Sequence, residues 1–245
     1  MDELKGKVAV ITGAGAGMGR GAAILFASRG AKVIAADISG AQMELAERFP
    51  DAVVPFACDV RNESEVEAMI AKATECFGRL DAVLNVAGFG LPGQLGDADM
   101  KDYDAMLDVD LRGVIHGTKH AIRAMRGTGG VILNWASVAA FGATPDWGMY
   151  SAGKAGVVAI TKAAAVENAT AGIRANVIAP GTIVTQAFEQ MPDALAEQLM
   201  ASIPAQRFGQ PEEVAELAAF LVSDRAKFLT GAVIPIDGGQ TARLA

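Results

Sequence analysis

The sequence predicts an α/β protein with a doubly wound, mostly parallel seven-stranded sheet and helices on both faces. The prediction rests on composition, on short apolar runs that alternate with helical patterns, and on a glycine-rich turn after the first run. Hydrophobic residues make up 51% of the 245-residue chain, and glycine occurs 28 times. A chain of this length and composition can bury a substantial core.

Seven short apolar runs are expected to form the strands. They are nearly continuous in apolar residues rather than alternating, which is typical of parallel strands buried on both faces. The runs span Lys7–Gly13, Ala31–Asp37, Ala52–Asp59, Leu80–Gly88, Gly130–Ser137, Ile173–Gly181 and Gly231–Gly239. Helical patterns between them include Gly19–Arg29, Glu63–Phe77 and Pro211–Leu221, the last with a proline suited to a first helical turn. Strands that alternate with helices in this way predict a doubly wound sheet.

One domain is expected over residues 1–245, because no Pro/Ser-rich linker, low-complexity tract or internal repeat interrupts the sequence. The least regular stretch is the excursion at about 186–210. Short amphipathic helices are expected there, built on Phe188, Met191, Leu195, Leu199 and Met200.

Charge and cysteine content narrow the class of protein. The net charge of -7 and the pI near 4.9 argue against a nucleic-acid partner, since phosphate binding requires a basic face. No apolar run approaches the length that spans a bilayer, and the first residues lack the pattern of a secretory signal. Cys58 and Cys76 have no metal-binding spacing. These features predict a cytoplasmic protein without a membrane partner.

The turn "TGAGAGMGRG", Thr12–Gly21, follows the first predicted strand. The common dinucleotide pattern G-x-G-x-x-G/A fits only from Gly17, which is late relative to the strand. The spacing T-G-x-x-x-G-x-G fits better, with Gly13, Gly17 and Gly19. Such a turn lets the backbone approach a pyrophosphate at a helix N-terminus. The alternative is an ordinary flexible turn between a strand and a helix.

Asp37 ends the second predicted strand. A carboxylate there can accept hydrogen bonds from the adenosine ribose and would repel a 2′-phosphate. No Arg or Lys precedes Arg20 in the glycine turn, and Ile38 and Ser39 follow Asp37. The sequence therefore predicts NAD rather than NADP as cofactor. The alternative is that Asp37 only caps the helix expected near Gly40.

Tyr150 and Lys154 are four residues apart in "YSAGK", so on a helix they share a face. Ser137 closes the fifth predicted strand, and strand carboxyl ends line the ligand crevice of such sheets. An ammonium group favours the phenolate form of a neighbouring tyrosine, which can then exchange a proton with an alcohol or carbonyl oxygen. A serine hydroxyl can hold the same oxygen. The alternative for Tyr150 and Lys154 alone is an ordinary helical pair.

Taken in register, these motifs resemble the short-chain dehydrogenase/reductase family over nearly the whole chain. The motifs are "TGAGAGMG", "CDV" (Cys58–Val60), "NVAG" (Asn85–Gly88), Ser137, "YSAGK" and "PGTIVT" (Pro180–Thr185). The resemblance implies a Rossmann-type sheet, nicotinamide-dependent redox chemistry at an alcohol or carbonyl carbon, and a homotetramer. It implies catalytic roles for Ser137, Tyr150 and Lys154. The cofactor contacts it implies are Gly13, Gly17, Met18, Gly19, Asp37, Ile38, Asp59, Val60, Asn85, Ala87, Gly88, Tyr150, Lys154, Pro180, Gly181, Ile183 and Thr185.

Asp110 in "LDVDLRG" departs from the family, which commonly has an asparagine that supports a water between the lysine and solvent. An aspartate can still accept from water, so Asp110 is a fourth candidate catalytic residue. If ionised, it would favour the ammonium of Lys154 and weaken the stabilisation of the phenolate. We therefore expect an alkaline-shifted pH profile relative to Asp110→Asn. The alternative is a tolerated replacement without kinetic effect, because the two side chains are nearly isosteric.

The sequence thus predicts an NAD-dependent enzyme that interconverts a secondary alcohol and its ketone, with an apolar, alicyclic or steroid-like substrate. Phe141, Trp147, Met149 and the excursion at about 186–210, as a substrate loop, are candidates for the substrate pocket or, equally, for an interface or the core. A 3-oxoacyl carrier-protein reductase is the alternative enzyme, and a non-catalytic NAD-binding sensor or scaffold is the alternative class. His116 and His120 have a spacing that can bind zinc, but no carboxylate motif accompanies them, so no metal is expected. Helix packing or a subunit interface is the preferred role for these histidines.

Overall fold

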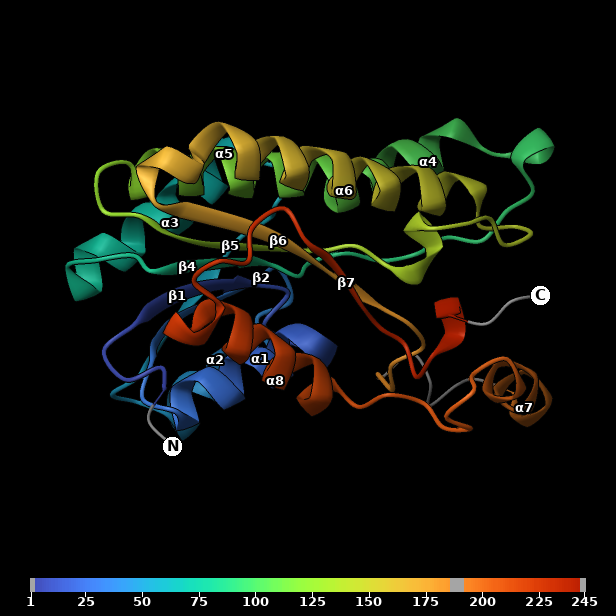
Figure 1. Ribbon diagram of the computed structural model, residues 1–245, viewed down its shortest axis with the longest axis horizontal. Helices are drawn as coiled ribbons and strands as arrows, with labels where there is room; N and C mark the ends of the chain where they lie inside the picture. Colours follow the sequence, from blue (N-terminus) through green and yellow to red (C-terminus); the bar gives the residue numbers. More distant parts are fainter. Residues whose placement is uncertain (1–2, 186–191, 243–245) are drawn as a thin grey trace.

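The computed structural model describes residues 3–185 and 192–242, and its seven strands form one sheet (Figure 1). The strand order is β3-β2-β1-β4-β5-β6-β7, and all six pairings are parallel. The predicted doubly wound α/β fold is confirmed. The strands are β1 Val8–Thr12, β2 Lys32–Asp37, β3 Val53–Ala57, β4 Ala82–Asn85, β5 Gly130–Trp135, β6 Ile173–Pro180 and β7 Val233–Ile236.

Helices cover both faces of the sheet (Figure 1). One layer holds α1 (Gly17–Ser28), α2 (Met43–Arg48) and α8 (Pro211–Val222). The opposite layer holds α3 (Glu63–Phe77), α4 (Met100–Leu107), α5 (Val114–Met125) and α6 (Gly148–Asn168). Short helical turns complete the described structure: η1 Leu95–Asp97, the π-helical η2 Asp108–Gly113, η3 Val138–Ala140, η4 Ala169–Ala171, η6 Asp224–Ala226 and η7 Gln240–Ala242.

The continuous apolar runs arise because both faces of each strand are buried. Ala9 and Ile11 of β1 pack with residues of α1 and α8, whereas Val8 and Val10 pack with residues of α3 and α5. Successive side chains of a strand point to opposite faces, so a strand between two helical layers needs apolar residues at every position.

The predicted helix ends agree with the structure to within two residues, and local signals explain them. Pro211 occupies the first turn of α8, where Gln210 N–H donates to Glu213 Oε2 at 2.8 Å. Asn62 caps α3 by accepting a hydrogen bond from Ser64 N–H, and Gly78 ends it in the left-handed conformation, with φ 75°.

The predicted excursion at 186–210 contains one described helix, α7 (Asp193–Ala201), which carries Leu195, Leu199 and Met200. Phe188 and Met191 lie outside the described residues. Figure 1 shows α7 beyond the carboxyl end of the sheet, on the side where the C-terminus lies. Across residues 3–185 and 192–242, the structure has no helix with the length and apolar character needed to cross a membrane.

Candidate active site

A cavity of about 620 Å³ opens at the carboxyl ends of β1, β2 and β4. In the sheet β2 and β4 flank β1 on opposite sides, and open α/β sheets bind ligands at such a reversal of strand order. The volume falls in the range of cofactor sites. Eleven of the predicted cofactor residues line the cavity: Gly13, Gly17, Met18, Gly19, Asp37, Ile38, Asp59, Val60, Ala87, Gly88 and Thr185.

The glycine turn forms one wall of this cavity because the backbone there leaves no room for side chains. Gly13 has a φ of +66°, and a Cβ on it would lie 3.0 Å from Ala87 Cα. A Cβ on Gly19 would lie 2.1 Å from the carbonyl oxygen of Gly13. Both positions therefore require glycine. The turn has the tight packing between strand and helix that a dinucleotide cradle needs.

The N-terminus of α1 supplies the donors for an anion. The helix begins at Gly17, directly after the turn, and the residue before it, Ala16, has no side chain that could cap the helix. The first turn also contains no acidic residue. Its free N–H groups and the helix dipole therefore suit a phosphate group. Thr185 borders the same point, since a Cβ on Gly17 would lie 3.3 Å from Thr185 Cγ2.

Asp37 is held rigidly against the glycine turn. Its Oδ2 accepts a hydrogen bond from Gly15 N–H at 2.8 Å, and its Oδ1 accepts one from Ser39 N–H at 2.8 Å. Burial raises the pKa of Asp37, but the hydrogen bonds from Ser39, Gly15 and Ile38 outweigh it and hold the pKa below its usual value. The side chain is therefore an ionised acceptor at neutral pH. Sequence reasoning missed Gly15, whose N–H orients this carboxylate.

Arg61 is a cation in the cavity wall that sequence reasoning also missed. Its Nε and one terminal nitrogen contact both oxygens of Asp59, at 2.6–3.0 Å. This bidentate pair lowers the pKa of Asp59. Neighbouring Cys58 is buried, and burial, with the Glu65 and Asp59 carboxylates, raises the pKa of its thiol to about 12. Cys58 is therefore protonated and unsuited to act as a nucleophile.

Asn85, a predicted cofactor contact, turns its side chain into the core instead of the cavity. Its Nδ2 donates to Asn134 Oδ1 at 2.7 Å, and both side chains are buried. Asn134 Nδ2 in turn contacts the hydroxyls of Thr118 and Thr161 at 3.1 and 2.9 Å. This network fixes the end of β4. The backbone that follows supplies Val86, Ala87 and Gly88 to the cavity.

Five further predicted contacts also lie outside the cavity lining: Tyr150, Lys154, Pro180, Gly181 and Ile183. Ile183 is 5% exposed and pairs with Gly209, and Gly181 packs against Asp237 after β7. The remaining lining residues, which were not among the predicted contacts, are Thr12, Ala16, Ala36, Cys58, Arg61, Val86, Phe89, Ala105 and Val109. Ala16, Cys58 and Val86 lie within the motifs quoted above, whereas Ala36, Ala105 and Val109 carry no local sequence signal for a binding site.

Tyr150 lies in the first turn of α6 and Lys154 one turn later. Lys154 Nζ is 5.5 Å from the centre of the Tyr150 ring. The Trp147 ring meets that of Tyr150 edge to face, with centroids 5.5 Å apart and planes at 74°. The predicted helical pair thus shares one face, and an aromatic contact orients the tyrosine.

Lys154 and Asp110 form a buried ion pair. The Nζ and Oδ2 atoms are 3.0 Å apart, in side chains that are 5% and 1% exposed. Lys154 also donates to the Trp135 carbonyl at 3.3 Å, and Asp110 Oδ1 accepts from Phe89 N–H at 2.8 Å. A Cβ on Gly88 would lie 2.9 Å from Asp110 Oδ1 and 3.1 Å from Lys154 Nζ. The pair therefore lies directly behind the backbone that lines the cavity.

The π-helical segment η2 places Asp110 in this position, between α4 and α5. A π-turn rotates the residues that follow it relative to an α-helix and is frequent at functional sites. Burial raises the pKa of Asp110, while the Lys154 ammonium and Phe89 N–H act in the opposite direction. On the same segment Asp108 pairs with Arg112 at 2.8 Å, so Lys154 is the one cation at ion-pair distance from Asp110 within the described ranges.

Ser137 lies two residues beyond the end of β5. Its Oγ accepts a hydrogen bond from Ala139 N–H at 3.2 Å. The serine hydroxyl therefore keeps its proton for another acceptor, and it is half-buried.

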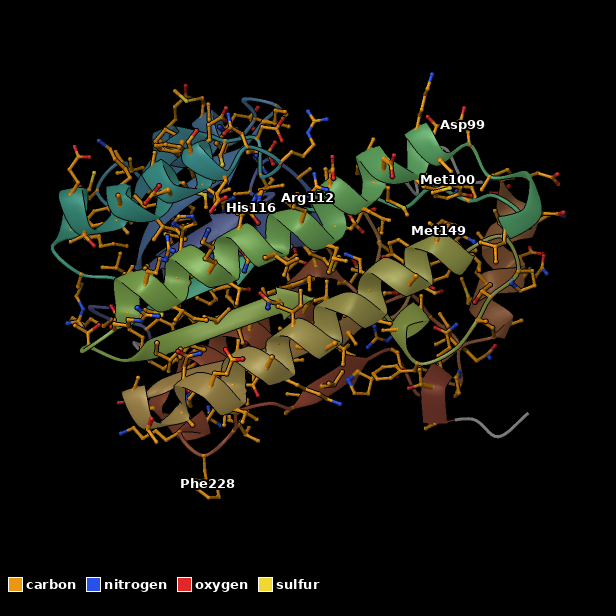
Figure 2. All side chains as sticks on the ribbon, turned by 90° about the horizontal axis from the view of Figure 1, so that it is seen from above. Asp99, Met100, Arg112, His116, Met149 and Phe228 are labelled. Atoms are coloured by element: carbon orange, nitrogen blue, oxygen red, sulfur yellow. The ribbon has the colours of Figure 1, made fainter. Side chains whose placement is uncertain are left out.

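An apolar flank adjoins Tyr150. Trp147 packs against the loop after β4, where a Cβ on Gly90 would lie 2.6 Å from Trp147 Cζ3. Gly93 N–H donates to the carbonyl of Asp146 at 2.7 Å, so the two loops are joined. Phe89 and Phe141 remain 42% and 47% exposed. Figure 2 shows Met149 at the beginning of α6 and Met100 at the beginning of α4.

His116 and His120 are engaged by neighbouring elements. His116 Nδ1 lies 3.1 Å from the Val60 carbonyl, and His120 Nε2 lies 3.0 Å from Glu63 Oε1 on α3. Figure 2 shows His116 on α5. No group of three or more His, Cys, Asp or Glu within residues 3–185 and 192–242 is arranged to hold a metal ion. These contacts agree with a helix-packing role.

A doubly wound sheet with a glycine turn and a cavity at the carboxyl ends of its strands has the architecture of dinucleotide-binding oxidoreductases. A family model described as enoyl-(acyl carrier protein) reductase matches residues 13–241. The chain is 39% identical to the 3-oxoacyl-(acyl-carrier-protein) reductase FabG of Thermotoga maritima, covering 96% of this chain and 98% of that protein. It is 37% identical to the levodione reductase of Leifsonia aquatica, covering 96% and 94%. It is 38% identical to the cis-4-hydroxycyclohexanecarboxylate dehydrogenase of Sinomonas cyclohexanicum, covering 96% and 97%.

The chain belongs to the short-chain dehydrogenase/reductase family, whose members are oxidoreductases that use nicotinamide cofactors.

Proposed function

We propose that the protein is an NAD-dependent oxidoreductase that interconverts a secondary alcohol and its ketone. The observation that carries the proposal is the position of Lys154 Nζ, 5.5 Å from the centre of the Tyr150 ring on α6 and directly behind the Gly88 backbone of the cavity. A tyrosine paired with a lysine that lies against the cavity wall supports a role for Tyr150 as the proton-exchanging group.

The residues that would hold the cofactor fit its chemistry. The glycine turn and the N-terminus of α1 would bind the pyrophosphate, and Asp37 would accept hydrogen bonds from the ribose hydroxyls. Asp59 and Val60 would border the adenine. The bound nicotinamide supplies the hydride chemistry. The ionised Asp37 would repel a 2′-phosphate, which supports NAD over NADP. Arg61, the cation in the cavity wall, is paired with Asp59 and is therefore engaged elsewhere.

The side chains of this protein would handle the proton. The Tyr150 hydroxyl gives a proton to the ketone oxygen during reduction and takes one from the alcohol during oxidation. The Lys154 ammonium favours the phenolate form through its positive charge. The Ser137 hydroxyl donates a hydrogen bond to the same substrate oxygen. Asp110 holds the ammonium in place through the buried ion pair and carries its own negative charge close to it.

An apolar, alicyclic or steroid-like substrate is favoured by the aromatic residues beside Tyr150. Trp147 packs against the Tyr150 ring, Phe89 lines the cavity, and the Phe141 ring is exposed after β5. One of the similar proteins is named for its action on a hydroxycyclohexane carboxylate. We further propose that the chain is one domain and that it acts in the cytoplasm as a homotetramer.

Two alternative functions differ from this proposal in substrate or in the absence of catalysis. Reduction of 3-oxoacyl groups on a carrier protein is supported by the 39% identity to the Thermotoga maritima enzyme. Such reductases generally use NADPH bound at a basic glycine turn, and this turn has no cation before Arg20. A non-catalytic NAD-binding sensor would bind NADH without turnover.

The test follows NADH formation at alkaline pH over a panel of secondary alcohols, with NADP in parallel. Tyr150→Phe should abolish turnover, whereas Tyr103→Phe, which removes the only other tyrosine hydroxyl, should retain it. Turnover with NADP alone would overturn the cofactor assignment. NADH binding without turnover on alcohols and ketones would favour the sensor, and activity confined to carrier-bound 3-oxoacyl groups would favour the carrier-protein reductase.

A further inference from the structure

A second cavity, of about 550 Å³, lies at the amino ends of the strands, whereas the cavity with the glycine turn lies at their carboxyl ends. Its floor is formed where strands begin: Lys7 precedes β1, Asp81 precedes β4, and Arg174 is the second residue of β6. The loop between α8 and β7 closes the other side with Asp224, Lys227, Phe228 and Thr230. The length of the strands therefore separates this cavity from the glycine turn.

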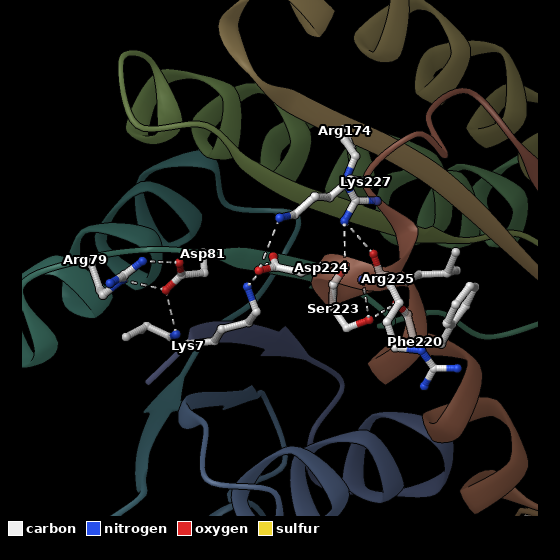
Figure 3. A network of polar contacts seen from close by, with 11 residues as sticks. Lys7, Arg79, Asp81, Arg174, Phe220, Ser223, Asp224, Arg225 and Lys227 are labelled. Atoms are coloured by element: carbon white, nitrogen blue, oxygen red, sulfur yellow. Dashed lines mark hydrogen bonds and ion pairs between the residues drawn. The ribbon is translucent and has the colours of Figure 1, made fainter. Parts of the chain in front are cut away.

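Arg174 brings a half-buried positive charge into this cavity without a carboxylate partner. Its guanidinium donates to the carbonyls of Leu221 and Leu229, at 2.7 and 3.2 Å, and reaches that of Ser223 at 3.5 Å (Figure 3). No Asp or Glu of residues 3–185 and 192–242 lies within ion-pair distance of it. Burial lowers the pKa of Arg174, and the Asp224 carboxylate acts in the opposite direction without reaching ion-pair distance.

Two lysines add to this charge and share one carboxylate. Lys7 Nζ and Lys227 Nζ each lie 3.6 Å from an oxygen of Asp224 (Figure 3). These separations exceed normal hydrogen-bond lengths, so the two pairs are loose. Lys7 lowers the pKa of Asp224, followed by Lys227, so the carboxyl is ionised at neutral pH.

The other carboxylate of the cavity is already engaged. Asp81 accepts hydrogen bonds from Arg79 at 2.6 and 2.8 Å and from Val8 N–H at 2.8 Å. Its charge is therefore balanced by Arg79. In the cavity lining, Asp224 is then the one carboxylate that offsets the positive charges of Lys7, Arg174 and Lys227. This excess of positive charge occurs in a protein whose formal net charge is -7.

We propose that this second cavity binds a small phosphate-bearing anion. Arginine and lysine together suit a phosphate group: the two lysine ammonium groups can donate to its oxygens, and the half-buried Arg174 guanidinium adds fixed positive charge. The volume exceeds that of phosphate alone and falls in the range of small-molecule sites, so a phosphate monoester fits the space. The site is independent of the proposed redox activity.

Inorganic phosphate is the probe, measured by titration calorimetry and by the shift in Tm, with chloride at equal ionic strength as reference. Saturating NADH is present to occupy the glycine turn, which could itself bind phosphate. Phosphate should bind the wild type and raise its Tm more than chloride does. The double variant Lys7→Gln/Lys227→Gln should bind phosphate about tenfold more weakly or worse, since losing about 1.4 kcal/mol is a tenfold change.

Lys72→Gln is the matched control, because Lys72 pairs with Glu75 at i,i+3 as Lys227 pairs with Asp224, and it lies outside the cavity lining. It should bind phosphate as the wild type does. Lys227→Gln alone changes an exposed side chain and supplies an intermediate loss if the double variant folds poorly. A phosphate response equal to chloride, unchanged in both Lys227 variants, or abolished by NADH would overturn the proposal.

Discussion

Lys154 Nζ and Asp110 Oδ2 lie 3.0 Å apart in the interior, and Asp110 also accepts a hydrogen bond from the backbone of Phe89. The Asp110 side chain therefore connects Lys154 of α6 to the loop after β4. A buried carboxylate beside a buried ammonium neutralises its charge, and the field that the lysine exerts on Tyr150 is weakened accordingly.

Asp110→Asn is predicted to move the acid limb of the pH profile for alcohol oxidation to lower pH by about one unit. The substitution removes the negative charge beside Lys154, so the ammonium stabilises the Tyr150 phenolate more strongly. Burial raises the pKa of Asp110, so the wild-type carboxyl takes up a proton towards low pH and the two profiles should converge there.

The profiles are measured as kcat/KM against pH. Asp108→Asn is the control, because Asp108 lies on the same π-helical segment but pairs with Arg112. An acid limb that does not move in Asp110→Asn would show that the carboxylate has no influence on the proton-exchanging group.

Gly88→Ala is predicted to lower kcat by about a hundredfold, because displacement of a positioned catalytic group by 1 Å has an effect of that order. The added Cβ would lie 2.9 Å from Asp110 Oδ1 and 3.1 Å from Lys154 Nζ, so the ion pair must shift. Gly142→Ala is the control, because no atom lies within 4 Å of the Cβ it would add. Steady-state kinetics with equal kcat for the two variants would contradict this prediction.

Asp37→Ser is predicted to reduce kcat/KM for NAD by about tenfold and to raise it for NADP, since one to two hydrogen bonds to a charged acceptor are lost along with the repulsion of a 2′-phosphate. Asp51→Ser changes an exposed aspartate elsewhere and should leave the ratio of the two cofactors unchanged. The same ratio in Asp37→Ser as in the wild type would remove Asp37 from cofactor selection.

Trp147→Ala is predicted to lower kcat by about tenfold or more while the KM for NAD stays constant. Loss of the edge-to-face contact frees the Tyr150 ring, and orientation of the reacting group carries much of the rate. Phe228→Ala removes a fully exposed aromatic ring far from α6's first turn and serves as the control (Figure 2). A parallel rise in the KM for NAD would indicate a general collapse of the site instead.

Asn134→Ala is predicted to lower the free energy of unfolding by about 2–4 kcal/mol, because Asn85, Thr118 and Thr161 would lose a buried partner. Asn168→Ala, which removes a single bond to the Ala164 carbonyl, should cost about 1 kcal/mol. Urea unfolding followed by circular dichroism provides both values. Equal losses would mean that the network stabilises the protein no more than one surface bond does.

The sequence was informative wherever a local pattern has a local physical cause. The strands were predicted because a β-strand between two helical layers must be apolar at every position, as in β1. The spacing of Tyr150 and Lys154 alone predicts that they share one face of a helix, and the position of Asp37 at the end of a strand predicts its place in the site. The predicted strands ran beyond the observed ends at positions such as Gly13, where the backbone turns to a positive φ.

Tertiary structure decided which of these groups meet. The direct pairing of Asp110 with Lys154 depends on a π-turn in one helix and on the packing of another, and neither is encoded in a short motif. Asn85 turns into the core because Asn134, on the neighbouring strand, offers it a buried partner. Among the described residues Arg174 has no carboxylate at ion-pair distance, because the loop that carries Asp224 brings that carboxylate to Lys7 and Lys227 instead. Sequence by itself therefore determined the elements and the chemistry they carry, whereas distances between side chains far apart in the chain arose from packing.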